Sequence, residues 1–219
     1  RVMPQNPDLG LIVAAQRNLG EHFYWRFNQF LLPFYTMPPR SPGGHAFVPI
    51  DDSHCWVWTF GCKLDRPYTV EEILGMKRGT VSGPFGAEVD ANYYPLHNKA
   101  NDFLIDRQIQ RSHNFTGIVG TGNQDMAAQV GMGSITDRTQ EHLGVTDVGI
   151  IEMRRLLLNL AKDLCEGRAP LAAHNADAFD GVQGVSLVRK CDLTLDDCVK
   201  DAMTSFENTR RRAAALRQS

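Results

Sequence analysis

The residue with the clearest potential for chemistry is Asp125, which lies near the start of a short predicted helix. Gly117, Gly120 and Gly122 precede it and allow the backbone to fold closely ahead of that helix. A carboxylate in the first turn of a helix either caps unpaired N–H groups or faces inward and binds a cation. Because residues 126–130 are mostly apolar, we expect the helix and Asp125 to be buried. A buried carboxylate needs a partner, so capping and metal binding both remain open.

Histidines and cysteines are the other candidate ligands, and their spacing argues against a local metal site. No two histidines stand three or four residues apart, and no C-x-x-C or C-x-H pair occurs. Each histidine is therefore expected on the surface or in a hydrogen bond, and each cysteine as a structural thiol. Walker A, G-x-G-x-x-G and G-x-S-x-G signatures are also missing from this sequence. The histidines are His22, His45, His54, His97, His113, His142 and His174.

Composition and charge narrow the class of protein. The 219 residues are 42% hydrophobic, enough to bury a sizeable core as one domain. The formal net charge of −2 predicts no global positive field for nucleic acid or anionic lipid. No apolar run approaches the ~20 residues of a membrane span. We expect a cytoplasmic protein, and since the sequence starts at Arg1 directly in a pattern, we interpret it as a fragment of a longer protein.

The first part of the chain is dominated by patterns typical of strands. Residues 9–17 form a compact apolar run that favours a strand without excluding a helix. Residues 22–37 are rich in aromatic side chains and partly alternating, which predicts a second strand. Pro33 cannot donate a backbone hydrogen bond, so it should interrupt this strand.

Residues 45–64 give the clearest hairpin, with a tight turn at 51–53. Trp56, Trp58 and Phe60 alternate onto one side of its second strand. Two indoles on one face indicate the wall of a core or of a pocket, and the core is the more usual role for aromatic side chains.

A short helix is predicted next, starting at Thr69 and stopping at Gly79, with Glu72 completing a capping box. Residues 80–100 carry glycine, proline and asparagine with little periodicity. A loop of this length is usually functional or contacts a neighbour, so we interpret it as a long loop or a lid.

The last part of the chain is predicted to be helical. Residues 146–167 have one wide apolar face, which predicts a long helix packed on a sheet. Residues 168–191 are interpreted as loop, and Thr194 with Asp197 should start a final helix that runs to about residue 216. Strands first and helices afterwards predict an α+β domain in which a curved antiparallel sheet packs on a long C-terminal helix.

Five ordered sequence blocks between residues 101 and 158 are more specific than any single motif. They read NDFLIDR, NFTGI, QDMAAQVGMG, ITDRTQEHLGVTD and IIEMRRLL. This string resembles the C-terminal catalytic part of Rieske non-haem iron oxygenases, in the branch of phthalate 4,5-dioxygenases and aromatic O-demethylases. FYWRFNQFLLPFYTMPP and VPIDDSHCWVW extend the similarity upstream, so that it covers nearly the whole chain.

The resemblance implies a helix-grip, START-like fold, incomplete at its N-terminus, with residues 1–219 as the C-terminal part of the catalytic domain. Such enzymes hold one Fe(II) with two histidines and one aspartate and leave positions open for O₂ and substrate. By the motif match Asp125 is that aspartate, and hence a catalytic residue and metal ligand. The two histidines and the Rieske domain with its [2Fe–2S] cluster are expected upstream of Arg1.

The function implied by the resemblance is hydroxylation or O-demethylation of an aromatic acid with O₂ and electrons from NAD(P)H. A separate reductase would deliver the electrons, and copies of the subunit would assemble as a trimer or hexamer. Phe115 and Asn123, in the loop leading into the Asp125 helix, are candidate substrate-binding residues, with loop packing and capping as the alternative for both. The alternative function is a helix-grip domain that binds a hydrophobic small molecule without redox chemistry.

Overall fold

The computed structural model describes residues 2–4, 9–39, 43–63, 66–77, 86–179 and 182–217. The chain divides into two compact units. The first, here called the sheet unit, comprises Arg1–Ala46, Gly61–Arg66 and His142–Ser219. The second, the loop unit, comprises Phe47–Phe60 and Pro67–Glu141. None of the helices in the described ranges has the length and apolar character needed to span a membrane.

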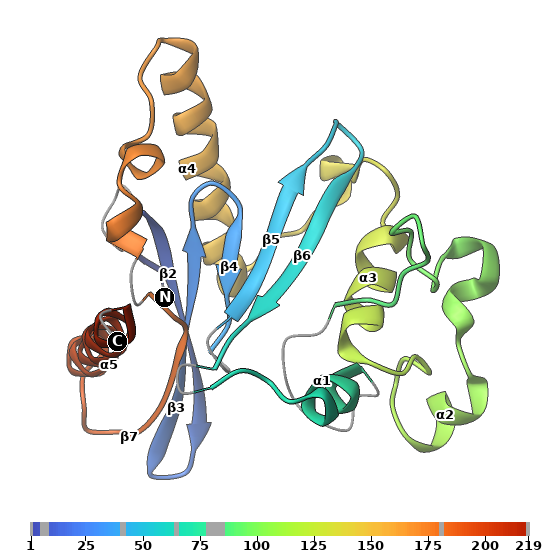
Figure 1. The fold of residues 1–219 in the computed structure, drawn as a ribbon, viewed down its shortest axis with the longest axis horizontal. Coiled ribbons are helices and arrows are strands. Elements are labelled where there is room, and N and C mark those ends of the chain that lie inside the picture. Colours follow the sequence, from blue (N-terminus) through green and yellow to red (C-terminus); the bar gives the residue numbers. More distant parts are fainter. Residues whose placement is uncertain are drawn as a thin grey trace. The chain divides into compact units, whose positions relative to one another are not determined.

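The sheet unit is built on a long antiparallel hairpin of β2 (Gly10–Leu19) and β3 (His22–Leu31) (Figure 1). Its register runs from Gly10 opposite Leu31 to Leu19 opposite His22. Both strands alternate side chains between two faces, as the β-rich composition of the segment predicts. The predicted strands are therefore confirmed.

Short strands complete this sheet, all in antiparallel pairs. β1 (Val2–Pro4) pairs with β2, and the far edge of β3 is shared by β7 (Val185–Lys190) and β4 (Tyr35–Met37). β5 (Gly43–Pro49) pairs with β4 through His45 and Ala46. The chain turns at 32–34 between β3 and β4, which confirms the predicted interruption at Pro33.

One face of this sheet is covered by α5 (Leu195–Arg217). Trp25 and Phe27 from β3 form a buried cluster with Cys198 and Ala202 from the helix. Thr194 and Asp197 bond each other reciprocally at the helix start, Asp197 N to Thr194 Oγ1 at 3.2 Å and Thr194 N to Asp197 Oδ2 at 3.1 Å. The α+β class, with a C-terminal helix on an antiparallel sheet, is thereby confirmed.

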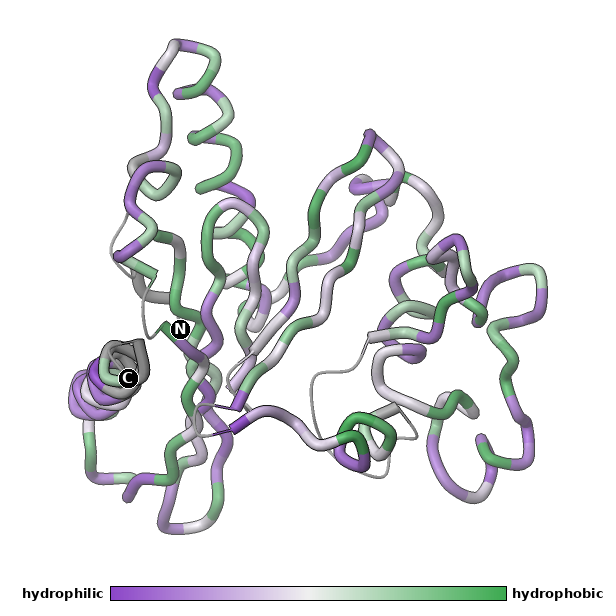
Figure 2. Tube along the Cα trace, in the orientation of Figure 1, coloured by the Kyte–Doolittle hydropathy of each residue, from purple (hydrophilic) through white to green (hydrophobic). Residues whose placement is uncertain are grey.

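The opposite face is covered by α4 (Val148–Cys165), which follows a single 3₁₀ turn at Val145–Asp147. The helix packs on the buried side chains of Leu11, Phe30 and Leu32. The residues of α4 that contact them are Met153, Leu156, Leu157 and Leu160. Figure 2 shows the alternation of hydrophobic and hydrophilic residues along this helix. The predicted packing of this helix on a sheet is correct, and the sheet unit has a helix on each face.

One sequence interpretation in the sheet unit is wrong. Residues 168–191 were expected to be loop, but Val185–Lys190 forms β7 and pairs with His22–Phe27 of β3. The described part of the segment before it contains two 3₁₀ turns, at Leu171–His174 and Ala176–Phe179. The strand is short and lies beside polar loops, so only its tertiary partner β3 makes it extended.

The loop unit contains the end of β5, β6 (Cys55–Gly61, of which Gly61 falls outside the unit) and a series of short helices. α1 (Val70–Lys77) begins with the expected capping box, Thr69 N to Glu72 Oε2 at 2.9 Å and Glu72 N to Thr69 Oγ1 at 3.2 Å. Its predicted end at Gly79, like residues 80–85 of the predicted loop, lies outside the described residues. Residues 86–98 do form a loop, with one isolated bridge between Val89 and Pro95.

The remaining elements of the loop unit are a distorted 3₁₀ segment (Lys99–Leu104), α2 (Arg107–Ser112), α3 (Thr121–Gly131) and a 3₁₀ turn (Arg138–Gln140). The aromatic face of β6 differs from its expected role in a core, since Trp56, Trp58 and Phe60 are exposed to 41, 58 and 40%. Trp56 instead meets Tyr93 edge to face, with ring centroids 5.4 Å apart.

Candidate functional site

Asp125 is the fifth residue of α3 and is exposed. The first turn of this helix contains no acidic residue, and its N-cap is Gly120, at a φ of 86°. Asp125 therefore lies beyond the N–H groups that a capping residue satisfies, so capping is the wrong interpretation. The expected burial is also wrong, because α3 has one buried residue, Asn123.

The Asp125 carboxylate differs from the other carboxylates of the motif blocks in having no partner in the described part of the chain. Asp106 caps α2 through Gln108 N at 2.7 Å and Ile109 N at 3.0 Å. Asp137 accepts from the side chain and backbone of Thr139, which lowers the pKa of its carboxyl. The remaining ones are paired as Asp102 with Arg107, Glu141 with Arg138, Asp147 with Gly144 N and Glu152 with Arg155. Asp125 is thus available for a ligand from outside these residues.

Asn123, a predicted substrate-binding residue, is 6% exposed and holds two backbone segments together. Its Oδ1 accepts from Glu88 N at 2.8 Å, and its Nδ2 donates to Val119 O at 3.0 Å. One side chain therefore joins the loop before α3 to the segment at 86–88. This is the packing and capping role that sequence reasoning left open, and one amide proton of Asn123 remains for another acceptor.

Close backbone contact reinforces this junction. A Cβ added at Gly122 would lie 2.5 Å from the backbone carbon of Gly86, so only glycine fits there. A Cβ at Gly86 would in turn lie 3.1 Å from Thr59 Oγ1 on β6. The start of α3, residue 86 and β6 are therefore stacked in contact, which fixes where α3 begins.

The loop that enters α3 is organised by Asn114, the first residue of the NFTGI block. Its Oδ1 accepts from Thr116 N at 3.0 Å and from Gly117 N at 2.7 Å. Gln124, next to Asp125, donates from Nε2 to Ile118 O at 2.8 Å. These short-range bonds explain why polar residues occupy the motif positions, since they replace the backbone bonds that a loop lacks.

Phe115, the second predicted substrate-binding residue, lies at the tip of this loop with 97% of its surface exposed. Its carbonyl accepts from Gln110 Nε2 at 3.1 Å, so its backbone is held although its ring is not packed. An exposed ring of this size, beside an ordered backbone, is available to contact a partner or ligand. The substrate-binding role of Phe115 stays a prediction.

His97 and Glu88 are polar residues near Asn123 that sequence reasoning did not single out. His97 is 12% exposed at its side chain, its Nδ1 lies 2.9 Å from Phe103 O, and its Nε2 lies 3.4 Å from Glu88 Oε2. The expectation that this histidine is hydrogen-bonded is confirmed. No spacing signal in the sequence pairs it with Glu88, because the loop geometry alone brings the two together.

Within the described ranges, no cluster of three or more His, Cys, Asp or Glu side chains has the geometry to hold a metal ion. Asp125 would therefore contribute one oxygen ligand to any metal site, with further ligands from elsewhere.

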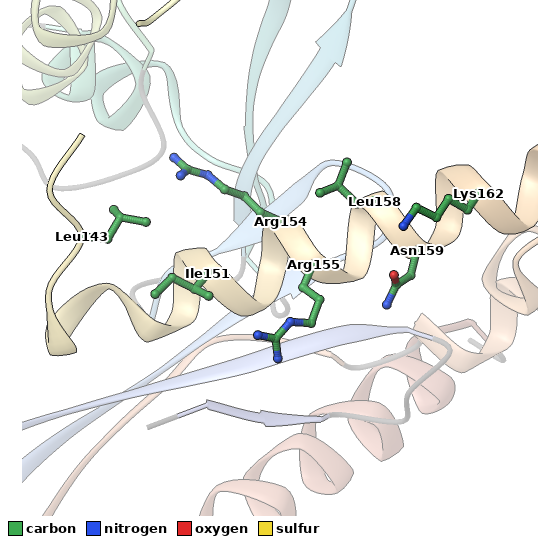
Figure 3. Close-up of a pocket in the computed structure, with 7 residues that line it drawn as sticks. All are labelled: Leu143, Ile151, Arg154, Arg155, Leu158, Asn159 and Lys162. Carbon is green, nitrogen blue, oxygen red and sulfur yellow. The ribbon is translucent and has the colours of Figure 1, made fainter. Parts of the chain in front are cut away.

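A shallow hollow of about 370 Å³ lies on α4 in the sheet unit (Figure 3). Leu143, Ile151 and Leu158 supply its apolar part, and Arg154, Arg155, Asn159 and Lys162 its polar part. None of the predicted site residues lines this hollow. It does not coincide with the predicted iron site.

Comparison with known proteins gives one family. The family model described as LigXa C-terminal domain like matches residues 12–186. The phthalate 4,5-dioxygenase oxygenase subunit of Pseudomonas putida is 38% identical over 170 residues, which cover 73% of this chain and 37% of that protein. The 3-chlorobenzoate-3,4-dioxygenase oxygenase subunit of Comamonas testosteroni is 33% identical over 189 residues, which cover 78% and 43%.

A third relative is the 5,5'-dehydrodivanillate O-demethylase oxygenase subunit of a Sphingobium species, 35% identical over 85 residues, 39% of this chain and 19% of that protein. The matched region thus spans about two fifths of the length of the first two relatives. Because the family model covers most of the chain and the sequence blocks around Asp125 agree with it, the chain belongs to the LigXa C-terminal-domain-like family, the C-terminal part of Rieske non-haem iron oxygenase large subunits.

Proposed function

We propose that this chain is the catalytic portion of an oxygenase subunit that hydroxylates or O-demethylates an aromatic acid at a mononuclear Fe(II). Two of the relatives are named as dioxygenase subunits and one as an O-demethylase subunit, all with aromatic substrates. These names favour an oxygenase over the alternative, a domain that binds a hydrophobic molecule without redox chemistry.

The observation that carries the proposal is the unpaired carboxylate of Asp125. The paired carboxylates of the motif blocks have structural tasks, whereas Asp125 is exposed on α3 and makes no hydrogen bond or ion pair with the described residues. A free carboxylate fits the aspartate of a two-histidine, one-carboxylate iron site. In the full-length protein, bound Fe(II) would supply O₂ activation with electrons delivered one at a time. Asp125 would hold the metal, reduce the net charge of the site and leave coordination positions open.

The other residues near α3 have separate proposed tasks. Phe115 is proposed to contact the aromatic ring of the substrate, because its ring is exposed while its backbone is held by Gln110. Asn123 has one amide proton and one lone pair of Oδ1 left for a substrate contact, since both ends of its side chain already bond the backbone.

The partners are proposed from the family. A reductase using NAD(P)H would supply electrons through a [2Fe–2S] cluster in the Rieske domain of the full-length subunit. Two histidines outside this sequence would complete the iron site. A homo-oligomer, trimeric or hexameric, and a cytoplasmic location are further parts of the proposal.

The test is Asp125→Ala in the full-length oxygenase subunit. We expect loss of mononuclear iron and of turnover, with the [2Fe–2S] absorbance unchanged, because a carboxylate ligand is removed without touching the core. Asp52→Ala is the matched control, since Asp52 is another exposed carboxylate of the loop unit, in the hairpin turn. It should keep both iron and turnover.

Two outcomes would contradict the proposal. Retention of stoichiometric mononuclear iron by Asp125→Ala would show that Asp125 is not a ligand. Absence of mononuclear iron and of oxygen consumption in the unmodified full-length protein would favour the ligand-binding alternative.

A further inference from the structure

Glu88, the hydrogen-bond partner of Asn123, also contacts His97. Glu88 receives the Asn123 bond at its backbone N–H, and its carboxylate lies 3.4 Å from Nε2 of His97. Glu88 is thus joined at its backbone to α3, and its carboxylate binds His97 Nε2 in the form of the imidazole in which both ring nitrogens carry a proton. A single residue of the 86–98 loop therefore connects Asn123 in the first turn of α3 to a histidine 26 residues before Asn123 in the sequence.

His97 also forms a hydrogen bond to a turn whose backbone is strained. Its Nδ1 lies 2.9 Å from Phe103 O and must donate, because a carbonyl oxygen only accepts. Phe103 is the middle one of three consecutive non-glycine residues in the left-handed region, with φ values of 50°, 54° and 51° at Asp102, Phe103 and Leu104. Such a run is costly and persists only where surrounding contacts enforce it. The bond from His97 is one of those contacts.

The segment that follows this turn is hydrogen-bonded to the loop that enters α3. Two residues after Leu104, Asp106 donates its backbone N–H to Gly117 O at 2.9 Å, and Gly117 lies in the loop held by Asn114. The close fit is again one that requires glycine, since a Cβ at Gly117, at a φ of 70°, would lie 2.6 Å from Asp106 O. The start of α3 is therefore linked to Glu88, His97 and Phe103 in turn, and the segment after Phe103 is bonded to the loop that enters α3.

We propose that Asn123 and His97 are positioning residues that fix the start of α3 and thereby place Asp125; this rests on the proposed iron-ligand role of Asp125. The side chain of Asp125 forms no hydrogen bond or ion pair with the described residues, so the backbone of α3 alone determines where this side chain lies. Ligands of a metal site must be held within about 0.5 Å of their productive geometry. The Asn123–Glu88–His97 clamp supplies this restraint through two largely buried side chains, Asn123 and His97, joined by the exposed Glu88.

The experiment compares three variants of the full-length oxygenase subunit. Asn123→Ala removes both bonds at α3. His97→Asn keeps a donor near Phe103 O but is too short to reach Glu88, so it opens the clamp at its other end. Asn92→Ala is the matched control, an exposed asparagine in the same loop for which only backbone bonding to Asp90 is seen.

Three quantities are measured: amide hydrogen exchange at 86–88 and 121–125, the ratio of mononuclear iron to [2Fe–2S] cluster after iron loading, and steady-state kinetics. In Asn123→Ala we expect exchange about tenfold faster at these amides, from the loss of buried hydrogen bonds. The iron ratio and kcat should fall, and KM for the aromatic substrate should stay unchanged in His97→Asn, which removes no candidate substrate contact. His97→Asn should shift the same quantities by less, and Asn92→Ala should shift none.

A folded Asn123→Ala protein with unchanged exchange, iron ratio and kcat would overturn the proposal. If Asn123→Ala does not fold, His97→Asn decides, and an unchanged iron ratio in the folded His97→Asn protein would overturn it. Failure of the clamp is distinct from failure of the proposed function. In the first case Asp125→Ala still loses iron while the clamp variants keep it, whereas in the second Asp125→Ala keeps iron as well.

Discussion

The two units of this chain are held together by different kinds of contact. The sheet unit buries apolar side chains on both faces of β2 and β3, with α5 on one face and α4 on the other. Among the described residues of the loop unit, the buried hydrophobic side chains are Met76 and Ile118. Its segments are joined instead by polar side chains, such as those of Asn114 and Asn123, which form hydrogen bonds to the backbone of nearby loops.

The two kinds of contact have different effects: apolar burial stabilises the fold, and hydrogen bonds position particular groups. Apolar burial is non-directional and scales with the area removed from water, so it stabilises the sheet unit without fixing any one atom finely. Hydrogen bonds are directional and contribute less net free energy each, but they set the geometry of the groups they join. The unit that bears the proposed ligand uses the second kind of contact, as expected where position matters most.

The largest effect should come from placing a charge in the apolar packing of the sheet unit. Leu157→Asp puts a carboxylate against the buried side chains of Leu11, Phe30 and Leu32. We expect the free energy of unfolding to fall by about 3 kcal/mol or more, because an unpaired ion is buried. Urea unfolding followed by circular dichroism measures it.

Leu158→Asp is the matched control for this experiment. Leu158 is the next residue of α4 but is 63% exposed, so its substitution should change the free energy of unfolding by no more than about 0.5 kcal/mol. Equal losses in the two variants would show that α4 does not pack through the assigned face.

A smaller and local effect is expected in the loop unit from Asn114→Ala. It removes the acceptor of Thr116 N and Gly117 N and exposes both to water. Losing such bonds costs about 1–3 kcal/mol, which should appear as faster amide exchange at 116–117. Exchange at the β2–β3 hairpin should not change, because that region depends on apolar burial.

The control is Asn18→Ala, at the exposed end of β2. It should leave exchange in the loop unit unaltered. If Asn114→Ala instead accelerated exchange equally throughout the β2–β3 hairpin, the two units would share one source of stability rather than depend on different kinds of contact.

The smallest effect concerns the exposed turn between β5 and β6. The bond from Ser53 N, followed by the one from the His54 side chain, lowers the pKa of Asp51 from its ordinary 3.8 to about 2. Because the folded pKa is the lower one, the turn gains stability that is complete above pH 3.8 and is lost as pH falls through about 2. Carbon NMR titration of the Asp51 carboxyl should show this midpoint.

Asp51→Asn provides the reference for that titration, since it removes the titrating group and should abolish the pH-dependent change of the Ser53 and His54 amide shifts. A midpoint at 3.8 or above for Asp51 would mean that the turn bonds do not form in solution.

The elements that sequence reasoning predicted well are those with local signals. The β2–β3 hairpin, the break at Pro33 and the caps at Thr69 and Thr194 follow from alternation, a missing donor and short side-chain bonds. These features depend on residues within a few positions of each other, so the sequence displays them directly. The missed strand β7 lacks such a signal, because it becomes extended by pairing with β3 about 160 residues earlier.

For the candidate site, the sequence determined the family and pointed to Asp125 and to the proposed class of chemistry, since motif blocks are read along the chain. Only the tertiary structure decided that Asp125 is exposed and unpaired, and that Asn123 is buried and bonded to Glu88. It alone joined His97 to Glu88 and to Phe103. The physical reason is that exposure and long-range hydrogen bonds depend on which segments meet in space, and spacing along the chain does not encode that.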